Sequence, residues 1–326
     1  MHFCVVGATS WGLTLANLLA KNDAVVSVLT RGKDEANQIN SSRGLERIPD
    51  LVLSPLISAI SSNDMSTSFD GLVVAVPAQN FRKSIQDRKI LRDLPILSAS
   101  KGIEAETLSL MNEILIDEGW SPDDVSVLSG PNFAREIVQD LPALAVVASQ
   151  SRLQANFWQN GLSSDSFRVY TSSDVVGVEI SGALKNVIAI ATGAAFGMGF
   201  GINTCSALMT RGLSEITRLG KSLGASSETF LGLAGVGDLS ASCFSPLSRN
   251  FQLGKKIGEG QDPQKVIFEF NEVVEGFTTT SVALELAQKQ NIDMPVIAGV
   301  AAVLAGRISP REAVEFLLTR DLKSED

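Results

Sequence analysis

The sequence predicts a two-domain protein of the α/β class, in which a doubly wound, mostly parallel sheet at the N-terminus precedes an all-α C-terminal domain. Its length of 326 residues is sufficient for about two domains. Within residues 1–172, short β-branched and apolar runs alternate with amphipathic segments, which is typical of parallel strands covered by helices on both faces. Within residues 173–326 the strand pattern nearly disappears, and apolar residues recur with helical spacing.

The N-terminal domain is expected to contain a strand at each of its short, fully apolar runs. These runs cover residues 3–6, 25–29, 71–76, 96–99, 125–128 and 143–148. The amphipathic segments 11–21 and 108–118 lie between them and predict helices. Apolar strands that alternate with helices therefore predict a sheet with both faces buried.

The C-terminal domain is expected to consist of helices over residues 178–195, 204–223, 249–258, 279–290 and 296–305. Asp174 precedes the first of these and has a side chain suited to cap it. Gly224 and Gly258 lie at the ends of later segments and are interpreted as helix stops.

Charge and cysteine content narrow the class of function. The formal net charge of −9 disfavours nonspecific binding to nucleic acid or an anionic membrane, although a few placed cations can still bind a small anion. The three cysteines, Cys4, Cys205 and Cys243, are far apart, and their spacing indicates neither a disulfide framework nor a metal site. The first residues lack the basic segment of a signal peptide, and the longest small and apolar stretch, 187–198, is too short and glycine-broken to span a bilayer. A cytoplasmic enzyme without a metal is therefore expected.

The segment GATSWG, residues 7–12, follows the first expected strand and opens the first expected helix. At this position of a Rossmann-type sheet, backbone N–H groups and the helix dipole receive the pyrophosphate of a dinucleotide. Gly7 and Gly12 match the glycine pattern, but Thr9 occupies the place of the second glycine, which normally lets the backbone approach the phosphates. The segment favours dinucleotide binding, with a purely structural turn as the alternative.

The end of the second expected strand bears on which dinucleotide is used. NAD-specific sites usually have an acid here for the ribose 2′-hydroxyl, whereas a cation favours the 2′-phosphate of NADP. This chain has Arg31 at that place, and acids follow only at Asp34 and Glu35. Arg31 therefore favours NADPH, or use of both cofactors, with an exposed loop arginine as the alternative.

A lysine is the natural candidate for the proton-transfer group. Many dehydrogenases use histidine, but the only histidine here is His2, before the first strand. Lys185 lies in the long apolar helix that begins the second domain, among small neighbours at helical spacing such as Ser181, Gly182 and Ala189. A lysine on such a stripe either extends to water or faces a cavity in which a ligand packs closely.

Further candidates occur at strand ends and helix starts. Lys101 follows one expected strand, at the carboxyl-end crevice where open α/β sheets bind ligands. Gly130 and Asn132 follow a later strand in the segment GPNFA, which is also compatible with a helix-starting turn.

A glycine-rich turn before Asp238 leads to Ser248-Arg249-Asn250 at a helix start. That cluster suits a phosphate, because arginine can form two hydrogen bonds to it and the helix N-terminus adds partial positive charge. A capped surface helix is an equally good interpretation.

Together these motifs resemble the NAD(P)-dependent glycerol-3-phosphate dehydrogenases of the bacterial type. The resemblance rests on GATSWG, SKGIE around Lys101, GPNFA, GALKN around Lys185, GVGDLSASCFSPLSRNFQLG over 235–254 and VVEG over 273–276, in the order and spacing of the family. It implies reduction of dihydroxyacetone phosphate to sn-glycerol 3-phosphate, the polar precursor of glycerophospholipids, with NADPH or NADH.

The resemblance also implies roles for individual residues. Those implied to bind the cofactor are Gly7, Ser10, Trp11, Gly12, Arg31, Lys101, Ala134, Arg249, Val273 and Glu275. Those implied to bind the substrate are Lys101, Gly130, Asn132, Lys185, Asp238, Ser248, Arg249 and Asn250. Lys185 is implied to be the proton donor and acceptor, assisted by Lys101 and Asp238, in a cleft between the domains.

Two residues depart from the family pattern. Thr9 stands where the family usually has glycine, which puts cofactor affinity in question, and Asn132 stands where it usually has serine or threonine. Two alternative functions stay open at this point, a β-hydroxyacid or ketopantoate-type reductase and a non-catalytic dinucleotide sensor. The partners expected are a small phosphorylated substrate and a second copy of the chain in a homodimer, formed through apolar faces of the helical domain.

Overall fold

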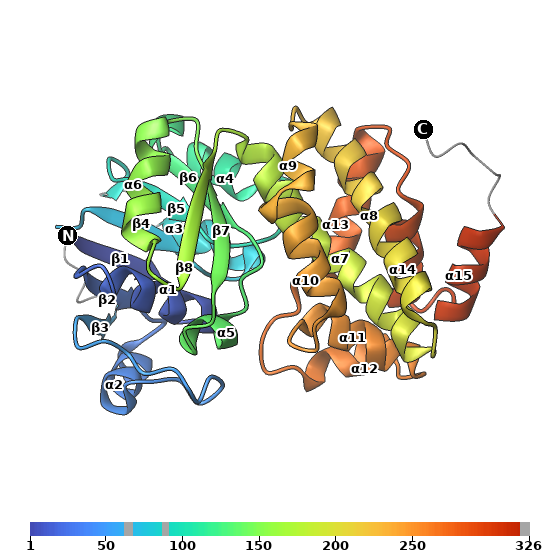
Figure 1. Ribbon diagram of the computed structural model, residues 1–326, viewed down its shortest axis with the longest axis horizontal. Helices are drawn as coiled ribbons and strands as arrows, with labels where there is room; N and C mark the ends of the chain where they lie inside the picture. The colour runs from blue at the N-terminus through green and yellow to red at the C-terminus, as the bar shows by residue number, and fades with distance from the viewer. Residues whose placement is uncertain (62–67, 87–90, 320–326) are drawn as a thin grey trace. The chain divides into compact units, whose positions relative to one another are not determined.

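The computed structural model describes residues 1–61, 68–86 and 91–319. The chain divides into two compact units (Figure 1). Unit 1 consists of Met1–Glu104 and Ser109–Glu179, and unit 2 of Ala105–Leu108 and Ile180–Asp326.

Unit 1 is built on one eight-stranded sheet with the order β3-β2-β1-β4-β5-β6-β7-β8. The strands are β1 (His2–Val6), β2 (Val25–Leu29), β3 (Ile57–Ile60), β4 (Gly71–Val74), β5 (Ile96–Ser98), β6 (Val125–Ser129), β7 (Ala143–Ala148) and β8 (Phe167–Ser172). All neighbouring pairs are parallel except β6 and β7, so the expected doubly wound, mostly parallel sheet is confirmed. The sequence analysis missed β3 and β8, which are the two edge strands.

The centre of the sheet is the point at which the strand order reverses. β1 pairs with β2 on one side and with β4 on the other, and Val6 is level with both Leu29 and Val74. The carboxyl ends of these three strands therefore lie side by side. In an open α/β sheet, ligands bind in the crevice outside such a reversal.

Helices cover both faces of this sheet (Figure 1). The cores show which helix covers which face: one contains residues of α1 (Ser10–Ala20), α2 (Lys33–Ser42), α5 (Ala134–Val138) and α6 (Arg152–Leu162). The other contains residues of α3 (Phe81–Gln86) and α4 (Met111–Asp117). Alternate residues of β1 enter the two cores, Phe3 and Val5 on one face and Cys4 and Val6 on the other.

The regular elements described in unit 2 are helices, as expected. The longest is α7 (Val175–Gly197), which starts in the last residues of unit 1. It is followed by α8 (Ile202–Ser222), α9 (Ser227–Leu231), α10 (Asp238–Phe244), α11 (Arg249–Gly258), α12 (Pro263–Val266), α13 (Glu275–Lys289), α14 (Pro295–Leu304) and α15 (Pro310–Leu318). Asp174 caps α7 as predicted, because its Oδ1 accepts a hydrogen bond from the Gly177 N–H at 2.9 Å.

Gly258 is not the helix stop that the sequence analysis took it to be. It is the last residue of α11, and the left-handed residue that follows the helix is Gly260, with φ +96°. A Cβ on Gly258 would lie 2.1 Å from the Ala194 carbonyl oxygen of α7, and one on Gly254 would lie 2.0 Å from that of Ile190. These glycines are therefore required for the close approach of α11 to α7.

The helix α7 is long and apolar enough to cross a membrane by length and composition, with a mean hydropathy of 1.5. However, 89% of its most apolar window is buried inside the structure. That degree of burial is typical of a core helix.

Candidate functional site

The loop after β1 has the geometry of a phosphate-binding turn. Gly7 has a φ of +112°, and a Cβ on it would lie 2.7 Å from the Ala75 carbonyl oxygen. A Cβ on Gly12 would lie 2.0 Å from the Gly7 carbonyl oxygen. Because both positions exclude a side chain, α1 starts directly beside the carboxyl end of β1, where its N-terminal N–H groups and dipole favour an anion.

Thr9 takes the place of the middle glycine in ordinary extended backbone, with φ −81° and ψ 167°. Its hydroxyl accepts a hydrogen bond from the Gly12 N–H at 2.9 Å and donates one to the Ala75 carbonyl at 2.8 Å. Thr9 therefore caps α1 and joins it to the chain just after β4. One N-terminal donor of α1 is satisfied by the protein itself.

Arg31 lies just beyond β2, as predicted, and pairs with Glu35 in the first turn of α2. Its guanidinium donates to the two carboxylate oxygens at 2.8 and 3.3 Å, and its side chain is 91% exposed. Burial acts to raise the pKa of Glu35, but the hydrogen bonds from Arg31 outweigh it and lower that pKa below its ordinary value. Glu35 is therefore ionised at neutral pH. A 2′-phosphate that binds Arg31 would have to share the guanidinium with Glu35 or displace this carboxylate.

Arg47 reaches the same loop, although the sequence analysis did not single it out. Its Nε donates to the Ser10 hydroxyl at 2.9 Å, and its Nη2 donates to the Ala8 carbonyl at 3.3 Å. It lies in an irregular segment between α2 and β3, 37 residues after Ser10. No local pattern marks such a residue, because only the fold returns this segment to the loop.

Lys101 and Gly130 meet at the ends of two adjacent parallel strands, β5 and β6. Lys101 Nζ donates to the Gly130 carbonyl at 3.0 Å. Gly130 has a φ of +142°, and a Cβ on it would lie 2.9 Å from the Leu144 carbonyl oxygen. The Asn132 amide donates to that same carbonyl, while its Oδ1 is buried without a hydrogen-bond partner in the described residues. An acceptor left in this way suits a hydroxyl or amide donor on a ligand.

Trp11 and Ala134 come from two helices that contact each other, α1 and α5. Both are partly buried, and both pack against the same hydrophobic core. The structure thus gathers the predicted cofactor residues of unit 1 at the carboxyl ends of β1, β2, β5 and β6.

Lys185, Asp238 and Ser242 form a buried polar group inside unit 2. Lys185 is 8% exposed, and its Nζ donates to Asp238 Oδ1 at 2.5 Å and to Ser242 Oγ at 2.8 Å. Asp238 is 1% exposed, so the ammonium and the carboxylate compensate one another away from water. The alternative in which Lys185 extends to solvent is wrong. Ser242 was not predicted, although it stands one helical turn after Asp238 and so shares its face of α10.

A kink at Gly235 delivers Asp238 to the start of α10. Gly235 has φ −87° and ψ −107°, and a Cβ there would lie 2.1 Å from the Phe230 carbonyl oxygen. The glycine-rich turn noticed in the sequence therefore serves a close backbone approach.

The Ser248-Arg249-Asn250 cluster starts α11, as predicted. Ser248 accepts a hydrogen bond from the Phe251 N–H and caps the helix. Arg249 is half exposed, donates to the Val273 carbonyl at 2.7 Å and pairs with Glu272 at 3.5 Å. The structure therefore brings Arg249 together with Val273, just before Glu275 opens α13.

Asn250 points into the helical unit. It is 9% exposed, its amide donates to the Asn186 side chain at 2.8 Å, and its Oδ1 accepts from the Gly276 N–H at 3.0 Å. Asn250 therefore joins α7, α11 and α13. Asn186, the neighbour of Lys185 in the sequence, was not predicted to take part.

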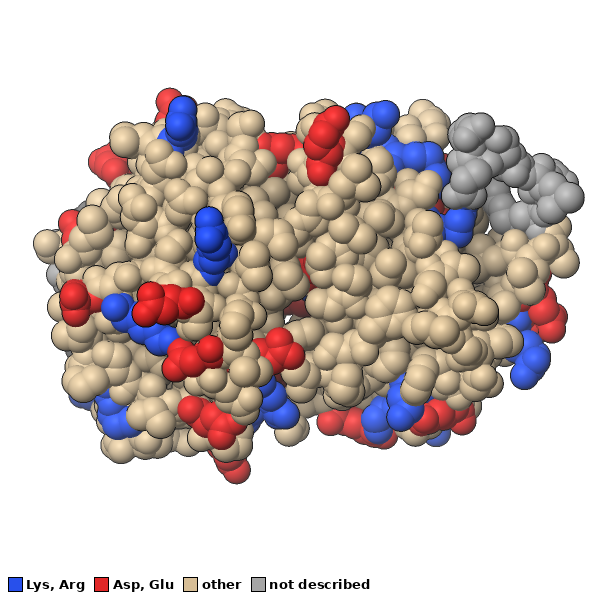
Figure 2. All heavy atoms as spheres, viewed as in Figure 1, with Lys and Arg blue, Asp and Glu red and all other residues tan. Residues whose placement is uncertain are grey.

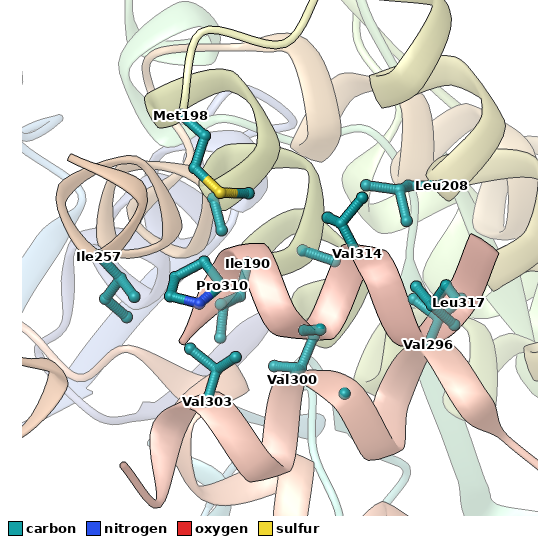
Figure 3. A pocket seen from close by; sticks show the side chains of 14 residues that line it. Ile190, Met198, Leu208, Ile257, Val296, Val300, Val303, Pro310, Val314 and Leu317 are labelled. Atoms are coloured by element: carbon teal, nitrogen blue, oxygen red, sulfur yellow. The ribbon is translucent and has the colours of Figure 1, made fainter. Parts of the chain in front are cut away.

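One cavity in unit 2 lies apart from these residues. It measures about 40 Å³ and is walled by apolar residues of α7, α8, α11, α14 and α15, among them Ile190, Leu208, Val300 and Val314 (Figure 3). A wall without polar side chains offers no catalytic group. Within residues 1–61, 68–86 and 91–319, no three His, Cys, Asp or Glu side chains are grouped to hold a metal ion.

The residues of unit 1 fit a dinucleotide. Gly7 and Gly12 exclude a side chain, so the backbone of the turn stays bare and the N-terminus of α1 adjoins it. Arg31 and Arg47 supply cations beside that turn, and Lys101 supplies another at the neighbouring strand ends. Phosphates and a ribose are the groups that such a set of donors holds.

Comparison with known proteins finds one family along almost the whole chain. Residues 2–155 match the family described as NAD-dependent glycerol-3-phosphate dehydrogenase N-terminus, and residues 174–315 match its C-terminus. A glycerol-3-phosphate dehydrogenase [NAD(P)+] of Geobacter sulfurreducens is 43% identical over 98% of both chains. One from Oleidesulfovibrio alaskensis is 40% identical over the full length of both. The crystal structure of glycerol-3-phosphate dehydrogenase from Coxiella burnetii, 33% identical, covers 98% of this chain and 99% of its own with a TM-score of 0.93.

Proposed function

Because this chain belongs to the NAD-dependent glycerol-3-phosphate dehydrogenase family, we propose that it reduces dihydroxyacetone phosphate to sn-glycerol 3-phosphate with NADPH or NADH. It is an NAD(P)-dependent oxidoreductase that acts on a CH–OH group. The product supplies glycerophospholipid synthesis. Membership of this family decides against the β-hydroxyacid or ketopantoate-type reductase and against the non-catalytic sensor.

The observation that carries the proposed chemistry is the buried Lys185–Asp238 pair. An ammonium can donate a proton, and here a carboxylate and a hydroxyl orient it away from bulk water. We assign cofactor binding to residues 1–172, and the proton donor and the substrate phosphate site to residues 173–326.

When bound, the reduced nicotinamide supplies the hydride that adds to the C2 carbonyl carbon of the substrate. Lys185 stabilises the negative charge that builds on the carbonyl oxygen and then transfers its proton to that oxygen. Asp238 and Ser242 hold the ammonium in place before the transfer. In the reverse direction, neutral Lys185 accepts the proton of the hydroxyl. Lys101 adds positive charge near the reacting atoms.

Arg249 is the proposed ligand of the substrate phosphate, with Ser248 and Asn250 at the N-terminus of α11. Glu272 pairs with Arg249, and a phosphate would offer the guanidinium a doubly charged partner in its place. Binding energy gained at this distant phosphate positions the carbonyl for reaction. Gly130 and Asn132 are proposed to line the substrate site, and Val273 and Glu275 to contact the cofactor.

The test of this function is NADPH and NADH oxidation at 340 nm, started by dihydroxyacetone phosphate. We expect substrate-dependent oxidation with wild-type protein, and a fall in kcat of about 10²–10⁴-fold in Lys185→Met, because a general acid contributes about that factor. NADPH binding, measured by quenching of tryptophan fluorescence, is expected to stay near the wild-type value.

Lys256→Met is the matched control, since it removes an exposed lysine of the same unit. A Lys185→Met protein that keeps most of its activity contradicts the proton-donor role. Folded wild-type protein that oxidises neither cofactor contradicts the proposed reaction.

We further propose that the protein is a homodimer and that it is located in the cytoplasm. The helical unit has exposed apolar side chains, such as Phe196, Ile202 and Leu231, that a dimer through this unit would cover. The three cysteines are buried thiols, and thiols are usual in proteins of a reducing compartment. Sedimentation velocity at micromolar concentration tests the dimer.

A further inference from the structure

The loop that carries Lys101 has no regular secondary structure, yet several of its residues are buried. Lys101 is followed by Gly102, Ile103 and Glu104, which are all buried, and the next helix begins only at Met111. Irregular segments usually run over the surface with mobile side chains. A catalytic cation on such a segment needs an anchor that holds its backbone in place.

Glu104 provides that anchor through Arg82. The Arg82 guanidinium donates to both Glu104 carboxylate oxygens at distances between 2.8 and 3.1 Å. Their side chains are only 23% and 11% exposed, so the pair is shielded from water. A planar, bidentate pair of this kind fixes direction as well as distance, which a single contact does not.

Arg82 is itself held from a second side. It lies in α3, just after β4, and also pairs with Asp117 at 3.3 Å and Glu118 at 3.1 Å in α4 and its C-cap. The guanidinium therefore stays in place without Glu104. Its position relative to the strands is set by α3 and α4, which share one hydrophobic core.

Two further hydrogen bonds act on the same loop. Gln79 donates its side-chain amide to the Ile103 carbonyl at 2.8 Å, and the Glu104 N–H donates to the Ser109 carbonyl at 2.9 Å. Glu104 and Ser109 flank the four residues Ala105–Leu108, which belong to unit 2. Glu104 therefore lies where the chain leaves unit 1, three residues after Lys101.

We propose that Glu104 and Arg82 are positioning residues for the reaction, because their partly buried ion pair holds the loop that sets Lys101 on the Gly130 carbonyl. The pair touches neither substrate nor cofactor and acts through Lys101. The expected effect on kcat/KM rests on the proposed function. A second effect is expected on the Kd of NADPH, because Lys101 is also proposed to bind the cofactor.

Glu104→Gln tests the pair, and Asp117→Asn is its matched control. Each removes one carboxylate from Arg82, but Asp117 is 57% exposed and belongs to α4 and not to the Lys101 loop. We expect Glu104→Gln to lower kcat/KM for dihydroxyacetone phosphate by about tenfold to a hundredfold, as misplacement of a catalytic group by about 1 Å does. The kcat/KM of Asp117→Asn is expected to stay within about twofold of the wild-type value, because an exposed ion pair contributes little.

A double-mutant cycle with Lys101→Met separates positioning from a general loss of structure. If Glu104 acts through Lys101, Glu104→Gln changes kcat/KM and the NADPH Kd by less than about twofold once Lys101 is methionine. Equal effects of Glu104→Gln in both backgrounds, in turnover and in NADPH binding alike, overturn the inference. If Glu104→Gln does not fold, Gln79→Met replaces it in the same double-mutant cycle. This variant removes only the hydrogen bond from Gln79 to the Ile103 carbonyl of the same loop.

The failure of this inference is distinguishable from the failure of the proposed function. Wild-type protein that binds NADPH but does not reduce dihydroxyacetone phosphate contradicts the reaction, whereas the NADPH Kd still reports the coupling of Glu104 to Lys101. Wild-type turnover with no coupling in either measurement contradicts the positioning role alone.

Discussion

Thr9 shows how one side chain changes the chemistry of a phosphate-binding turn. Its hydroxyl takes the Gly12 N–H that a turn with glycine would leave for a ligand or water. The side chain is directed to α1 and the Ala75 carbonyl, so the hydroxyl stabilises the turn. We therefore expect the arginines near the turn, rather than the Gly12 N–H, to contribute to phosphate binding.

Arg31 is expected to set the preference between the two cofactors. Arg31→Ala should weaken NADPH by about tenfold to a hundredfold, since a hydrogen bond between charged groups contributes about 1.5–3 kcal/mol. The Kd of NADH should change by less than about twofold, because NADH has a hydroxyl where NADPH has the 2′-phosphate. Titration of tryptophan fluorescence with each cofactor measures both constants. Lys21→Ala, an exposed lysine paired with Asp140 at the end of α1, is the control, and equal losses for the two cofactors would refute the role of Arg31.

Arg47 is expected to act on the part that the two cofactors share. It donates hydrogen bonds to Ser10 and to the Ala8 carbonyl at the turn that is expected to receive the pyrophosphate. Arg47→Ala should therefore weaken NADPH and NADH by a similar factor of about ten. The same titrations check this, and a loss confined to NADPH would assign Arg47 to the 2′-phosphate instead.

At the scale of elements, glycine determines how closely the helices of unit 2 pack. Gly193 and Gly197 of α7 face the backbone of α11, while Gly254 and Gly258 of α11 face the backbone of α7. Each would place a Cβ between 2.0 and 2.2 Å from a carbonyl oxygen of the other helix. Since Lys185 lies on α7 and Arg249 on α11, this contact fixes the proposed proton donor relative to the proposed phosphate site.

Gly254→Ala is expected to destabilise the protein, although alanine normally favours a helix interior by about 1 kcal/mol over glycine. The added Cβ would meet the Ile190 carbonyl oxygen, so the two helices must separate, at a cost of about 1–3 kcal/mol or more. Urea denaturation measures the difference. Gly201→Ala is the control, because a Cβ there meets no atom within 4 Å, and similar stability of both variants would contradict the argument.

At the scale of the whole molecule, acidic and basic side chains are interspersed over the face that Figure 2 shows, in a chain of net charge −9. A few carboxylates are buried instead, and Glu215, at 2% exposure, is one of them. Its oxygens accept hydrogen bonds from the Val296 and Ile297 N–H groups at 2.7 and 3.2 Å. Glu215, on α8, therefore caps the N-terminus of α14 from another helix.

Glu215 is expected to make stability depend on pH. Burial raises its pKa from 4.5 to about 7, despite the N–H donors that act to lower it. Between those values the folded state keeps a proton that the unfolded state has lost. The stability contributed by that proton is full below pH 4.5 and is lost as pH rises through about 7.

Urea denaturation of wild type and Glu215→Gln at pH 5 and pH 8 tests this. From pH 5 to pH 8 the free energy of unfolding of the wild type should fall by up to about 3 kcal/mol more than that of the variant. The reason is that one pKa unit corresponds to about 1.36 kcal/mol. Glu285→Gln removes an exposed carboxylate of the same unit and should behave as wild type. Parallel pH profiles for wild type and Glu215→Gln would show that this carboxyl does not titrate differently in the two states.

The sequence by itself determined the central strands, the long helices and the residue types of the site. Fully buried strands and amphipathic helices have apolar patterns that are local in the chain, so β1, β2 and β4–β7 were predictable. The sequence also singled out the glycine turn, Lys101, Lys185, Asp238 and the Ser248-Arg249-Asn250 cluster as candidates, because each stands at a strand end, a helix start or an unusual place in an apolar run. The edge strands β3 and β8 were missed, since an edge strand is only partly buried and its apolar pattern is interrupted by polar residues.

Only the tertiary structure decided which side chains meet. Ser10 and Arg47 are 37 residues apart, Lys185 and Asp238 are 53 apart, and Arg82 and Glu104 are 22 apart. The tertiary structure also shows that Gly258 serves the contact with α7, whereas Gly260 has the left-handed backbone after α11. The physical reason is the same in each case: a buried charge or a close backbone contact is stabilised by a partner from a distant segment, and that partner leaves no periodic trace in the local sequence.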